Sequence, residues 1–523
     1  MRYHPRVRFA GALLLAAWAL LSAAGCSCIL DFDRFNDASG AGDGGGPDGG
    51  ALLLQVVCGA GAGGGCALEE GIGTGVRAVP AALVASAPVF DATTTVAAPP
   101  GASVIVTGVR PPTGGPAALV GLTLVAPVDE SIDAGEVLVP LTVTVNGTNL
   151  GADVAVLVRH HPELIVTADS AATGGAYAFS SVVVSADYRA TGPEPLDVKV
   201  WGDVRLMAGA TFHVDGVLMP SGGGPGGPGA AGGVGGPGGG PMAAGASGSG
   251  AGPGLGGAGG IVGGPAATGG GGAGHGVSGQ SAPAGPGTGG GAYGDALLAT
   301  FPASEVAGSG GGGGGGGTVS GDLGGAGGEG GGALRLDVEG AVVFDAGARV
   351  SANGSAGGAG TGAGGTAAGG GGGSGGGVWI AAAEGLVGAS GSVEATGGPG
   401  AGGALPGGTG GSGYVRLDAP GAIVPLVLPA PLYYGVKWDW VLEETVGAAD
   451  VSGTVWGNPN LAVEVQLIDA TGASAIVITT ALDAGGQAVV PATLAPGWNL
   501  LRACSPDCVA PSSVDDITVV YVP

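Results

Sequence analysis

A nine-residue phrase in which apolar and polar positions alternate occurs three times along this chain. It reads PGASVIVTG at 100–108, AGATFHVDG at 208–216 and AGARVSANG at 346–354. The third, fifth and seventh residues of every copy are apolar, and the residues between them are polar apart from Ile105. A period of two with one apolar face predicts a half-buried β-strand, and the flanking glycines predict turns.

A longer repeat predicts how such strands are arranged. The sequences GGALRLDVEG at 331–340, GGVWIAAAEG at 376–385 and SGYVRLDAPG at 412–421 align without gaps, and 196–216 has the same strand-and-glycine layout. Repeats of short strands with glycine corners are typical of a parallel β-solenoid, or β-helix. A flat antiparallel sheet is the alternative, but it would expose edges that this chain does not guard with lysine.

We therefore expect an all-β protein whose solenoid carries long glycine-rich insertions. Because the phrase already occurs at 100–108, the β-rich region 51–216 is expected to begin the solenoid, and 331–423 to carry glycine-rich solenoid repeats. Between them, residues 217–330 form a glycine-rich insertion of low complexity.

The glycine tracts leave three possibilities open. Glycine accounts for 124 of the 523 residues, far above its usual fraction of about 7%, and it falls at every third position from 223 to 238. A collagen triple helix is the least favoured possibility because proline is sparse. A packed bundle of extended glycine helices also fits a period of three. Loose loops fit as well, and the sequence favours them.

Charge and apolar content exclude two broad classes of protein. The formal net charge is −25, from 15 basic and 40 acidic residues, so no basic stripe is available to neutralise phosphates. Nucleic-acid binding is therefore not expected. A hydrophobic fraction of 45% also exceeds that of a plain disordered linker.

The first 25 residues have the composition of a signal peptide. A basic start precedes an apolar run at 9–24, which is shorter than the ~20 residues of a membrane span. The run ends in AAGC at 23–26, which resembles a bacterial lipobox with Ala23 at the usual leucine position. The resemblance implies a mature chain that starts at a lipidated Cys26, and Ser27 implies sorting to the outer membrane. Cleavage by the ordinary signal peptidase, with release of a secreted protein, is the alternative.

Residues 26–50 are rich in glycine and aspartate and are expected to form a flexible tether. The clustered Asp31, Asp33 and Asp37 provide too few oxygen ligands for a calcium loop. We interpret them as a solvated acidic segment.

Two close pairs of cysteines remain once Cys26 is lipidated, and an exported compartment permits disulfides. The expected disulfides are Cys58–Cys66 and Cys504–Cys508. Cys28 is then the odd thiol. A zinc site is less favoured, because CSPDC at 504–508 has no second pair of ligands nearby.

The end of the chain differs in composition, with less glycine and more Trp, Tyr and Val. Residues 424–448 are expected to be a linker, followed by a small β-sandwich at 449–523. The sequences at 451–455, 494–501 and 517–521 resemble strands of a bacterial immunoglobulin-like domain.

Few residues offer chemistry. His160, His161 and Glu163 could form a metal site, but adjacent strand residues point to opposite faces, so a surface loop is favoured. His213 lies on the outward parity of its strand, and we expect it to be solvated. No metal site or cofactor is therefore predicted.

Catalytic patterns are also lacking. A glycoside hydrolase needs two carboxylates across the scissile bond, whereas Asp203, Asp215, Asp337 and Asp418 are scattered along the sequence. There is no G-x-S-x-G motif with a plausible histidine partner, and no G-K-[ST] closes a phosphate loop. The chain is therefore not expected to be an enzyme.

The whole layout resembles the glycine-rich surface lipoproteins of high-GC Gram-negative bacteria, which implies a cell-surface location and no established activity. We expect a lipid-anchored envelope protein with a structural or adhesive role. Its expected partners are the membrane, through Cys26, and an extracellular glycan or another envelope protein. A polysaccharide-binding or polysaccharide-degrading β-helix is the main alternative. An ice- or mineral-templating face is a weaker one, because no threonine ladder repeats.

Overall fold

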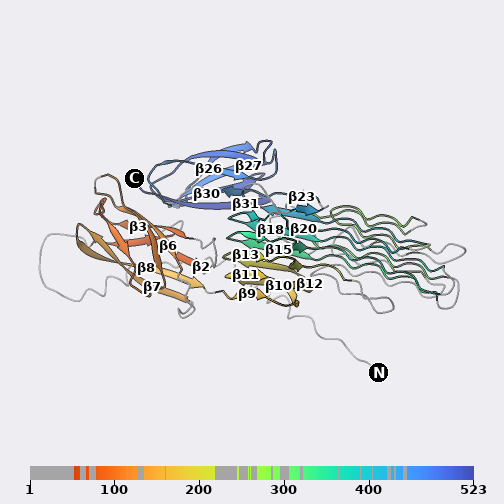
Figure 1. Ribbon diagram of the computed structural model, residues 1–523. Coiled ribbons are helices and arrows are strands. Elements are labelled where there is room, and N and C mark those ends of the chain that lie inside the picture. Colours follow the sequence, from red (N-terminus) through yellow and green to blue (C-terminus); the bar gives the residue numbers. More distant parts are fainter. Residues whose placement is uncertain are drawn as a thin grey trace, which may run out of the picture.

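The computed structural model shows an all-β protein (Figure 1). Every regular element within the described residues is a strand, which confirms the fold class predicted from the sequence. No helix long and apolar enough to cross a membrane occurs in that part of the chain. The described residues are 52–58, 66–69, 78–114, 116–126, 135–159, 161–217, 244–246, 257, 260, 268–283, 287–294, 306–317, 322–362, 366–388, 390–402, 405–420, 426–428, 431–439 and 445–523. Cys26, Cys28 and the predicted tether lie outside them.

The first module is an N-terminal sandwich of two four-stranded sheets, residues 52–159. The strand order is β1-β3-β6-β5 in one sheet and β2-β8-β7-β4 in the other. The strands are β1 (Leu54–Val57), β2 (Cys66–Glu69), β3 (Val79–Ala85), β4 (Thr95–Ala97), β5 (Ile105–Arg110), β6 (Leu119–Val125), β7 (Gly135–Val145) and β8 (Thr148–Arg159). All pairs are antiparallel except β2 with β8. Phe90 and Leu122 lie fully buried in the core of this sandwich.

This sandwich corrects the expectation that 51–216 begins the solenoid. The copy of the phrase at 100–108 leads into an antiparallel sheet, whereas the copies at 208–216 and 346–354 lie in parallel strands. In each copy the amide of the third residue donates to the carbonyl three residues earlier, and the second residue is a glycine with φ of 71 to 75°. The phrase therefore encodes a tight turn followed by a strand. This local structure occurs both in the antiparallel sandwich and in the parallel strands that follow it.

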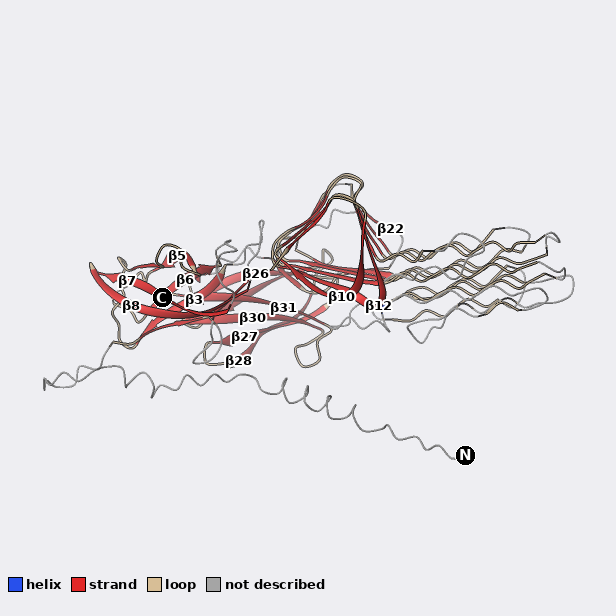
Figure 2. Ribbon diagram, turned by 90° about the horizontal axis from the view of Figure 1, so that it is seen from below, coloured by secondary structure: helices blue, strands red, loops and turns tan. Residues whose placement is uncertain are grey.

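The second module is a parallel coil, residues 163–433, in which the chain passes repeatedly through three strand positions (Figure 2). The first position holds β15 (Ala333–Val338), β18 (Gly377–Ala382), β21 (Tyr414–Asp418) and β23 (Leu432–Tyr433). The second holds β9 (Glu163–Val166), β11 (Ser181–Val184), β13 (Val204–Leu206), β16 (Val342–Phe344) and β19 (Leu386–Val387). The third holds β14 (Thr211–His213), β17 (Arg349–Ser351), β20 (Ser392–Glu394) and β22 (Leu426–Leu428). The longer β10 (Ser170–Phe179) and β12 (Asp187–Val200) each fill the third position of one turn and the first position of the next.

Apolar side chains stack in columns through the interior of the coil. Val198, Leu336, Ile380 and Leu417 pair from strand to strand, and none is more than 1% exposed. Burial of one such column in every turn supplies the hydrophobic stabilisation of the module. The parallel pairing agrees with the arrangement predicted from the repeats.

The third module is a C-terminal sandwich of a three-stranded and a five-stranded sheet. Its strands are β24 (Lys437–Asp439), β25 (Thr445–Val446), β26 (Asp450–Trp456), β27 (Ala462–Asp469), β28 (Ser474–Ala481), β29 (Gln487–Thr493), β30 (Gly497–Ser505) and β31 (Ser513–Tyr521). A β-sandwich was expected here, but from residue 449. The expected linker at 424–448 instead supplies β22 and β23 to the coil, and β24 and β25 to the sandwich.

The glycine tracts form a fourth module, the glycine bundle, from the described residues of 268–294, 306–332, 352–376 and 395–413. The amides of Gly371, Gly372 and Gly373 each bond a different neighbouring extended segment, in 306–317, 405–413 and 352–362. Their acceptors are the carbonyls of Gly312, Gly408 and Ser355. The next three amides return to the same three segments in the same order.

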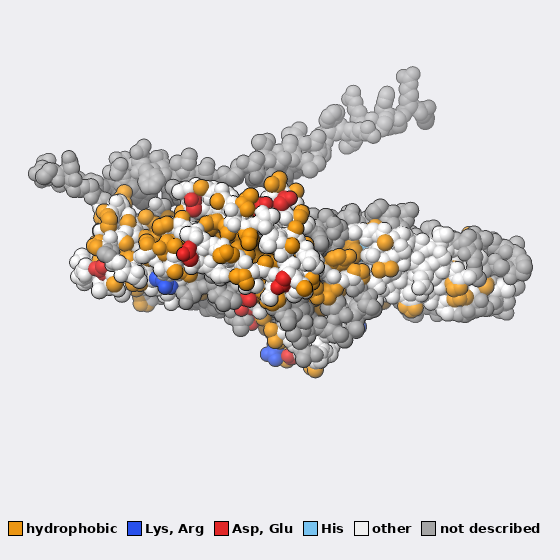
Figure 3. All heavy atoms as spheres, turned by 90° about the horizontal axis from the view of Figure 1, so that it is seen from above, with side chains coloured by type: hydrophobic (Ala, Val, Ile, Leu, Met, Phe, Trp, Pro, Cys, Tyr) orange, Lys and Arg blue, Asp and Glu red, His pale blue; other side chains and the backbone are white. Residues whose placement is uncertain are grey.

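A period of three in the hydrogen bonds is that of a polyproline II helix, which has three residues per turn and no internal hydrogen bonds. The described tracts are therefore packed extended helices and not the loose loops that the sequence favoured. Figure 1 shows them running side by side away from the strands of the coil. In the face shown in Figure 3, no charged side chains gather on the described part of this projection.

The C-terminal sandwich contacts both other β modules. Trp498 is 6% exposed and lies in an apolar cluster that includes Ala82 and Leu119 of the N-terminal sandwich. Arg110 also donates from Nη1 to the carbonyl of Thr445, at 2.9 Å. On its other side the sandwich meets the coil around a polar cavity.

Candidate functional site

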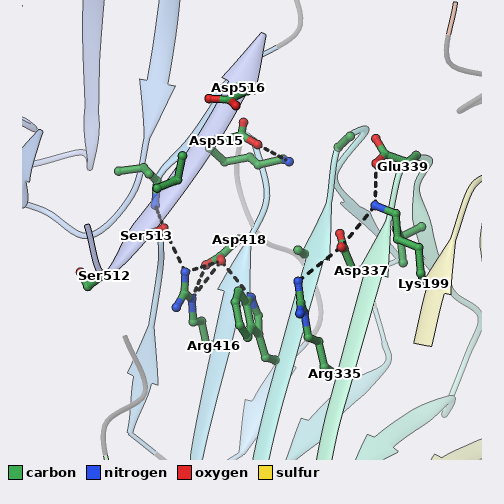
Figure 4. A pocket seen from close by; sticks show the side chains of 17 residues that line it. Lys199, Arg335, Asp337, Glu339, Arg416, Asp418, Ser512, Ser513, Asp515 and Asp516 are labelled. Carbon is green, nitrogen blue, oxygen red and sulfur yellow. Dashed lines mark hydrogen bonds and ion pairs between the residues drawn. The ribbon is translucent and has the colours of Figure 1, made fainter. Parts of the chain in front are cut away.

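A cavity of about 330 Å³ lies between the coil and the C-terminal sandwich (Figure 4). Strands β12, β15, β18 and β21 form its coil side, and β24 and β31 form its sandwich side. Its charged and hydroxyl-bearing residues are Lys199, Arg335, Asp337, Glu339, Arg416, Asp418, Lys437, Ser512, Ser513, Asp515 and Asp516. The close-up view shows Arg416 between Asp418 and Ser513, and Lys199 beside Asp337 and Glu339.

A tryptophan held between two arginines lines the coil side of the cavity. Parallel pairing places Arg335 and Arg416 on the strands to either side of Trp379. The guanidinium carbons lie 4.5 and 4.1 Å from the ring centroid, which is cation–π distance. The ring is therefore occupied from both sides and offers no free face for stacking on a sugar.

Arg416 and Asp418 form a buried ion pair at the junction. Their side chains are only 3% and 6% exposed, and Nη2 of Arg416 lies 2.8 Å from Oδ2 of Asp418. Asp418 also accepts from Nε1 of Trp379 at 2.9 Å and from the amide of Gly435 at 2.5 Å. Arg416 donates to Oγ of Ser513 at 2.9 Å, across to the sandwich. These added hydrogen bonds offset the cost of burying two charges.

A lysine on each side of the cavity is paired with carboxylates. Lys199 lies 2.5 Å from Glu339 and 3.2 Å from Asp337. Lys437 lies 2.8 Å from Asp515, whose other oxygen accepts from the amide of Trp438 at 2.8 Å. Burial of Lys437 favours its neutral form, but the carboxylates of Asp515, Glu339 and Asp337 together outweigh this and raise the pKa of Lys437 above its usual value.

The chemistry available in the cavity is limited by this pairing. Each of its five carboxylates lies within ion-pair distance of a lysine or arginine. The side chains of its four cations, Lys199, Arg335, Arg416 and Lys437, are at most 27% exposed. The hydrogen bonds from Arg416 to Ser513 and from the amide of Gly435 to Asp418 link the coil to the C-terminal sandwich. We call this set of polar contacts the joint.

The structure corrects the expectation that His213 is solvated. His213 is 8% exposed, with Nε2 3.2 Å from Asp187 and Nδ1 3.1 Å from Asp215. Asp215 also accepts from Oγ of Ser351 and from the amide of Asn353, on the next turn of the coil. Stacking of turns therefore covers the outward face of this strand. Because the two carboxylates lie at opposite nitrogens of the ring, they do not converge on one metal position.

Of the three residues that were weighed as a possible metal site and judged a surface loop, His161 and Glu163 each contact other side chains. His160 lies outside the described residues, His161 stacks on Trp201 with centroids 5.7 Å apart, and Glu163 accepts from Oγ of Ser181 at 2.9 Å. Among the residues that the structure describes, no group of His, Cys, Asp or Glu has the arrangement of a metal site.

Both predicted disulfides occur in the structure. The Cα atoms are 5.0 Å apart in Cys58–Cys66 and 5.1 Å apart in Cys504–Cys508. The first joins the residue after the end of β1 to the first residue of β2, and the second closes a short loop at the end of β30.

The grouping of the cavity residues was not predicted from the sequence. The reason is that β18 is shifted by one residue relative to the gapless alignment of the repeats. That alignment sets Ile380 beside Arg335, whereas in the structure Trp379 pairs with Arg335 and Ile380 with Leu336. A shift of one residue exchanges the two faces of a strand. The alternation of apolar residues in β18 could have predicted the correct register, because only that register places Val378 and Ile380 in the interior of the coil.

Comparisons with known proteins provide no relative from which a role can be carried over: no family model, no curated protein and no solved structure matches this chain.

Proposed function

We propose that this chain is a lipid-anchored protein of the bacterial cell envelope with a structural or adhesive role and no enzymatic activity. The observation that supports it most strongly is the hydrogen bonding of the glycine bundle. Successive amides of one tract are bound by three different neighbours, so each extended helix is held along its length. Such a module is a stiff projection, suited to holding a surface away from the membrane.

The joint between the coil and the C-terminal sandwich supports the same role. Arg416 donates to Ser513 and Asp418 accepts from the amide of Gly435, both at the junction. Trp498 packs the same sandwich against the N-terminal one. A body braced in this way transmits force between the proposed anchor at Cys26 and the projecting bundle. The immunoglobulin-like resemblance of the C-terminal sandwich is in keeping with a spacer or contact module.

The test begins with the anchor. The Cys26→Ala variant is expected to leave the membrane fraction and appear in the soluble fraction, because the lipid would be its attachment. Fractionation with an antibody to the C-terminal sandwich measures this, and protease shaving of intact cells measures surface exposure. Cys28→Ala is the matched control and should stay in the membrane.

The polysaccharide-degrading alternative is tested on the same preparations. The cavity holds the acids Asp337 and Glu339 close to one lysine, so Asp337→Asn with Glu339→Gln is the relevant variant. We expect no release of sugar from capsular, cell-wall or plant polysaccharides by wild type or variant. Release by the wild type that the double variant lacks would overturn the proposed function.

A further inference from the structure

The chain contains only two lysines, and both lie in the cavity between the coil and the C-terminal sandwich. Lys199 lines its coil side and Lys437 its sandwich side. All other basic residues of the chain are arginines. An ion pair can be built with either residue, but only lysine has an amine that, once neutral, can attack a carboxyl carbon. This cavity is therefore the one place where the side chains of this protein offer amine chemistry.

Lys437 and Asp515 are held in contact in a way that suits such an attack. Nζ of Lys437 lies 2.8 Å from Oδ1 of Asp515, and both side chains are 15% exposed. The other oxygen, Oδ2, accepts from the amide of Trp438 at 2.8 Å. A backbone N–H at this distance stabilises the negative charge that develops on a carboxyl oxygen under attack. One oxygen is thus held by a backbone donor, while the other faces the amine.

Lys199 is placed differently. It is shared between Glu339, at 2.5 Å, and Asp337, at 3.2 Å, and its side chain is 26% exposed. Its Nζ also lies 4.8 Å from the ring centroid of Trp201. An amine divided among three partners is not directed at a single carboxyl carbon. We therefore expect Lys199 to stay unmodified, which makes it an internal control.

We propose that Lys437 and Asp515 form an intramolecular amide, an isopeptide bond, between β24 and β31. Nζ of Lys437 bonds to Cγ of Asp515, and the bond from Cγ to Oδ1 breaks. Two of the three ammonium protons leave with Oδ1 as water. The ion pair is thus converted to an amide and one water molecule, without another reactant and without a change in net charge. Oδ2 remains as the amide oxygen and still accepts from the amide of Trp438.

The carboxylates of the coil can carry the protons during this step. Figure 4 shows Asp337 and Glu339 on the coil side and Asp515 on the sandwich side, and both coil residues stabilise the charge of Lys437. Because they favour the ammonium, the neutral amine is the minor form and the reaction is slow, but it has to occur only once in each chain. Effective molarities of well-oriented groups reach about 10⁵–10⁸ M. They exceed the concentration of liquid water, which offsets hydrolysis of the amide.

The bond would join the two sheets of the C-terminal sandwich. Strand β24 belongs to the three-stranded sheet and β31 to the five-stranded one, and the linked residues are 78 positions apart in the sequence. Because β24 is the first strand of the sandwich after the coil, a pull on the coil reaches the sandwich there, and the bond keeps this strand in place. That benefit rests on the proposed structural role, whereas the chemistry does not.

The scarcity of lysine gives a direct test. The full mature protein is denatured, reduced and digested with a protease that cleaves only after lysine, and the fragments are weighed by mass spectrometry. Two unmodified lysines would give three fragments, with cuts after Lys199 and Lys437. We expect a cut after Lys199 only. The fragment 200–523 should be lighter than its sequence by one water molecule.

Two variants at neighbouring positions identify the carboxyl group. Asp515→Ala should restore the cut after Lys437, with every fragment at the mass of its sequence. Asp516→Ala is the matched control and should keep the link, because Asp516 pairs with the exposed Arg502 and its loss costs little. Since the chains are denatured before digestion, the masses can be read even where a variant is unstable.

Release of 438–523 from the wild type would overturn the proposal. So would an uncut fragment 200–523 that has the full mass of its sequence, or a loss of one water molecule that persists in Asp515→Ala. None of these outcomes depends on whether Cys26 anchors the protein.

Discussion

At the level of single residues, packing of the glycine bundle depends on the absence of a Cβ atom at particular positions. A Cβ added at Gly371 would overlap the carbonyl of Gly271, and one at Gly373 would overlap the carbonyl of Glu329. At Gly291 it would meet nothing within 4 Å. Glycine is therefore required sterically at the centre of the bundle and is replaceable at its surface.

Gly371→Ala is expected to destabilise the bundle by about 1–3 kcal/mol, the usual cost of forcing an extra methyl group into a packed interior. Gly291→Ala should be close to neutral. Urea unfolding, followed by protease sensitivity of the bundle, measures both. Equal effects at the two positions would contradict the packing described here.

Local alternation predicted side-chain burial well on the inward face and poorly on the outward one. Phe212 and Val350 are fully buried, as their parity predicts. His213 has the opposite parity and is buried as well, because Asp215 and the next turn of the coil lie against it. Parity reports which residues face the interior of their own turn, but it does not report what neighbouring turns place over the outer surface.

At the level of elements, the strand register decides which outward residues become neighbours. The observed pairing aligns Arg335, Trp379 and Arg416 and brings Asp418 within hydrogen-bond distance of Nε1 of the tryptophan. The composition of the repeats identified the strands, while a gapless alignment misplaced the middle one by a single residue. Register is fixed by side-chain burial across the whole turn, which is a non-local property.

Arg416→Met tests this arrangement, since it removes one partner of a buried pair. Breaking such a pair typically costs about 3–5 kcal/mol because the remaining charge is left uncompensated. Arg205→Met removes an exposed partner, with a side chain 54% exposed and 3.4 Å from Asp345. Exposed pairs contribute about 0–1 kcal/mol.

Chemical denaturation of both variants gives the comparison. Adding Asp418→Asn to Arg416→Met should restore part of the loss, because no charge then remains buried. If Arg416→Met and Arg205→Met lower the free energy of unfolding equally, the buried pair contributes no more than an exposed one. That result would contradict the stabilising role assigned to Arg416 and Asp418.

At the level of the whole molecule, the C-terminal sandwich holds the other two β modules in place. It is hydrogen-bonded to the coil through Arg416 and Ser513, and it packs against the N-terminal sandwich through Trp498. The sequence predicted its β-sandwich fold but not these contacts. It also did not separate the N-terminal sandwich from the coil, because alternation is the same in antiparallel and parallel strands and the pairing partners lie far apart in sequence.

Trp498→Ala is expected to release the N-terminal sandwich from this assembly. The side chain is 6% exposed in a small cluster with Ala82 and Leu119, and truncation of a buried tryptophan typically costs about 3–5 kcal/mol. Since the cluster lies between modules, the loss should appear as a separate, earlier unfolding transition in calorimetry, with β1–β8 exchanging their amides first. Trp456→Ala, in the same C-terminal sandwich but outside the cluster, is the control and should lower the stability of that sandwich without splitting the transition. A single transition that shifts equally in both variants would contradict this role of Trp498. It would mean that the attachment of the N-terminal sandwich does not depend on the Trp498 cluster.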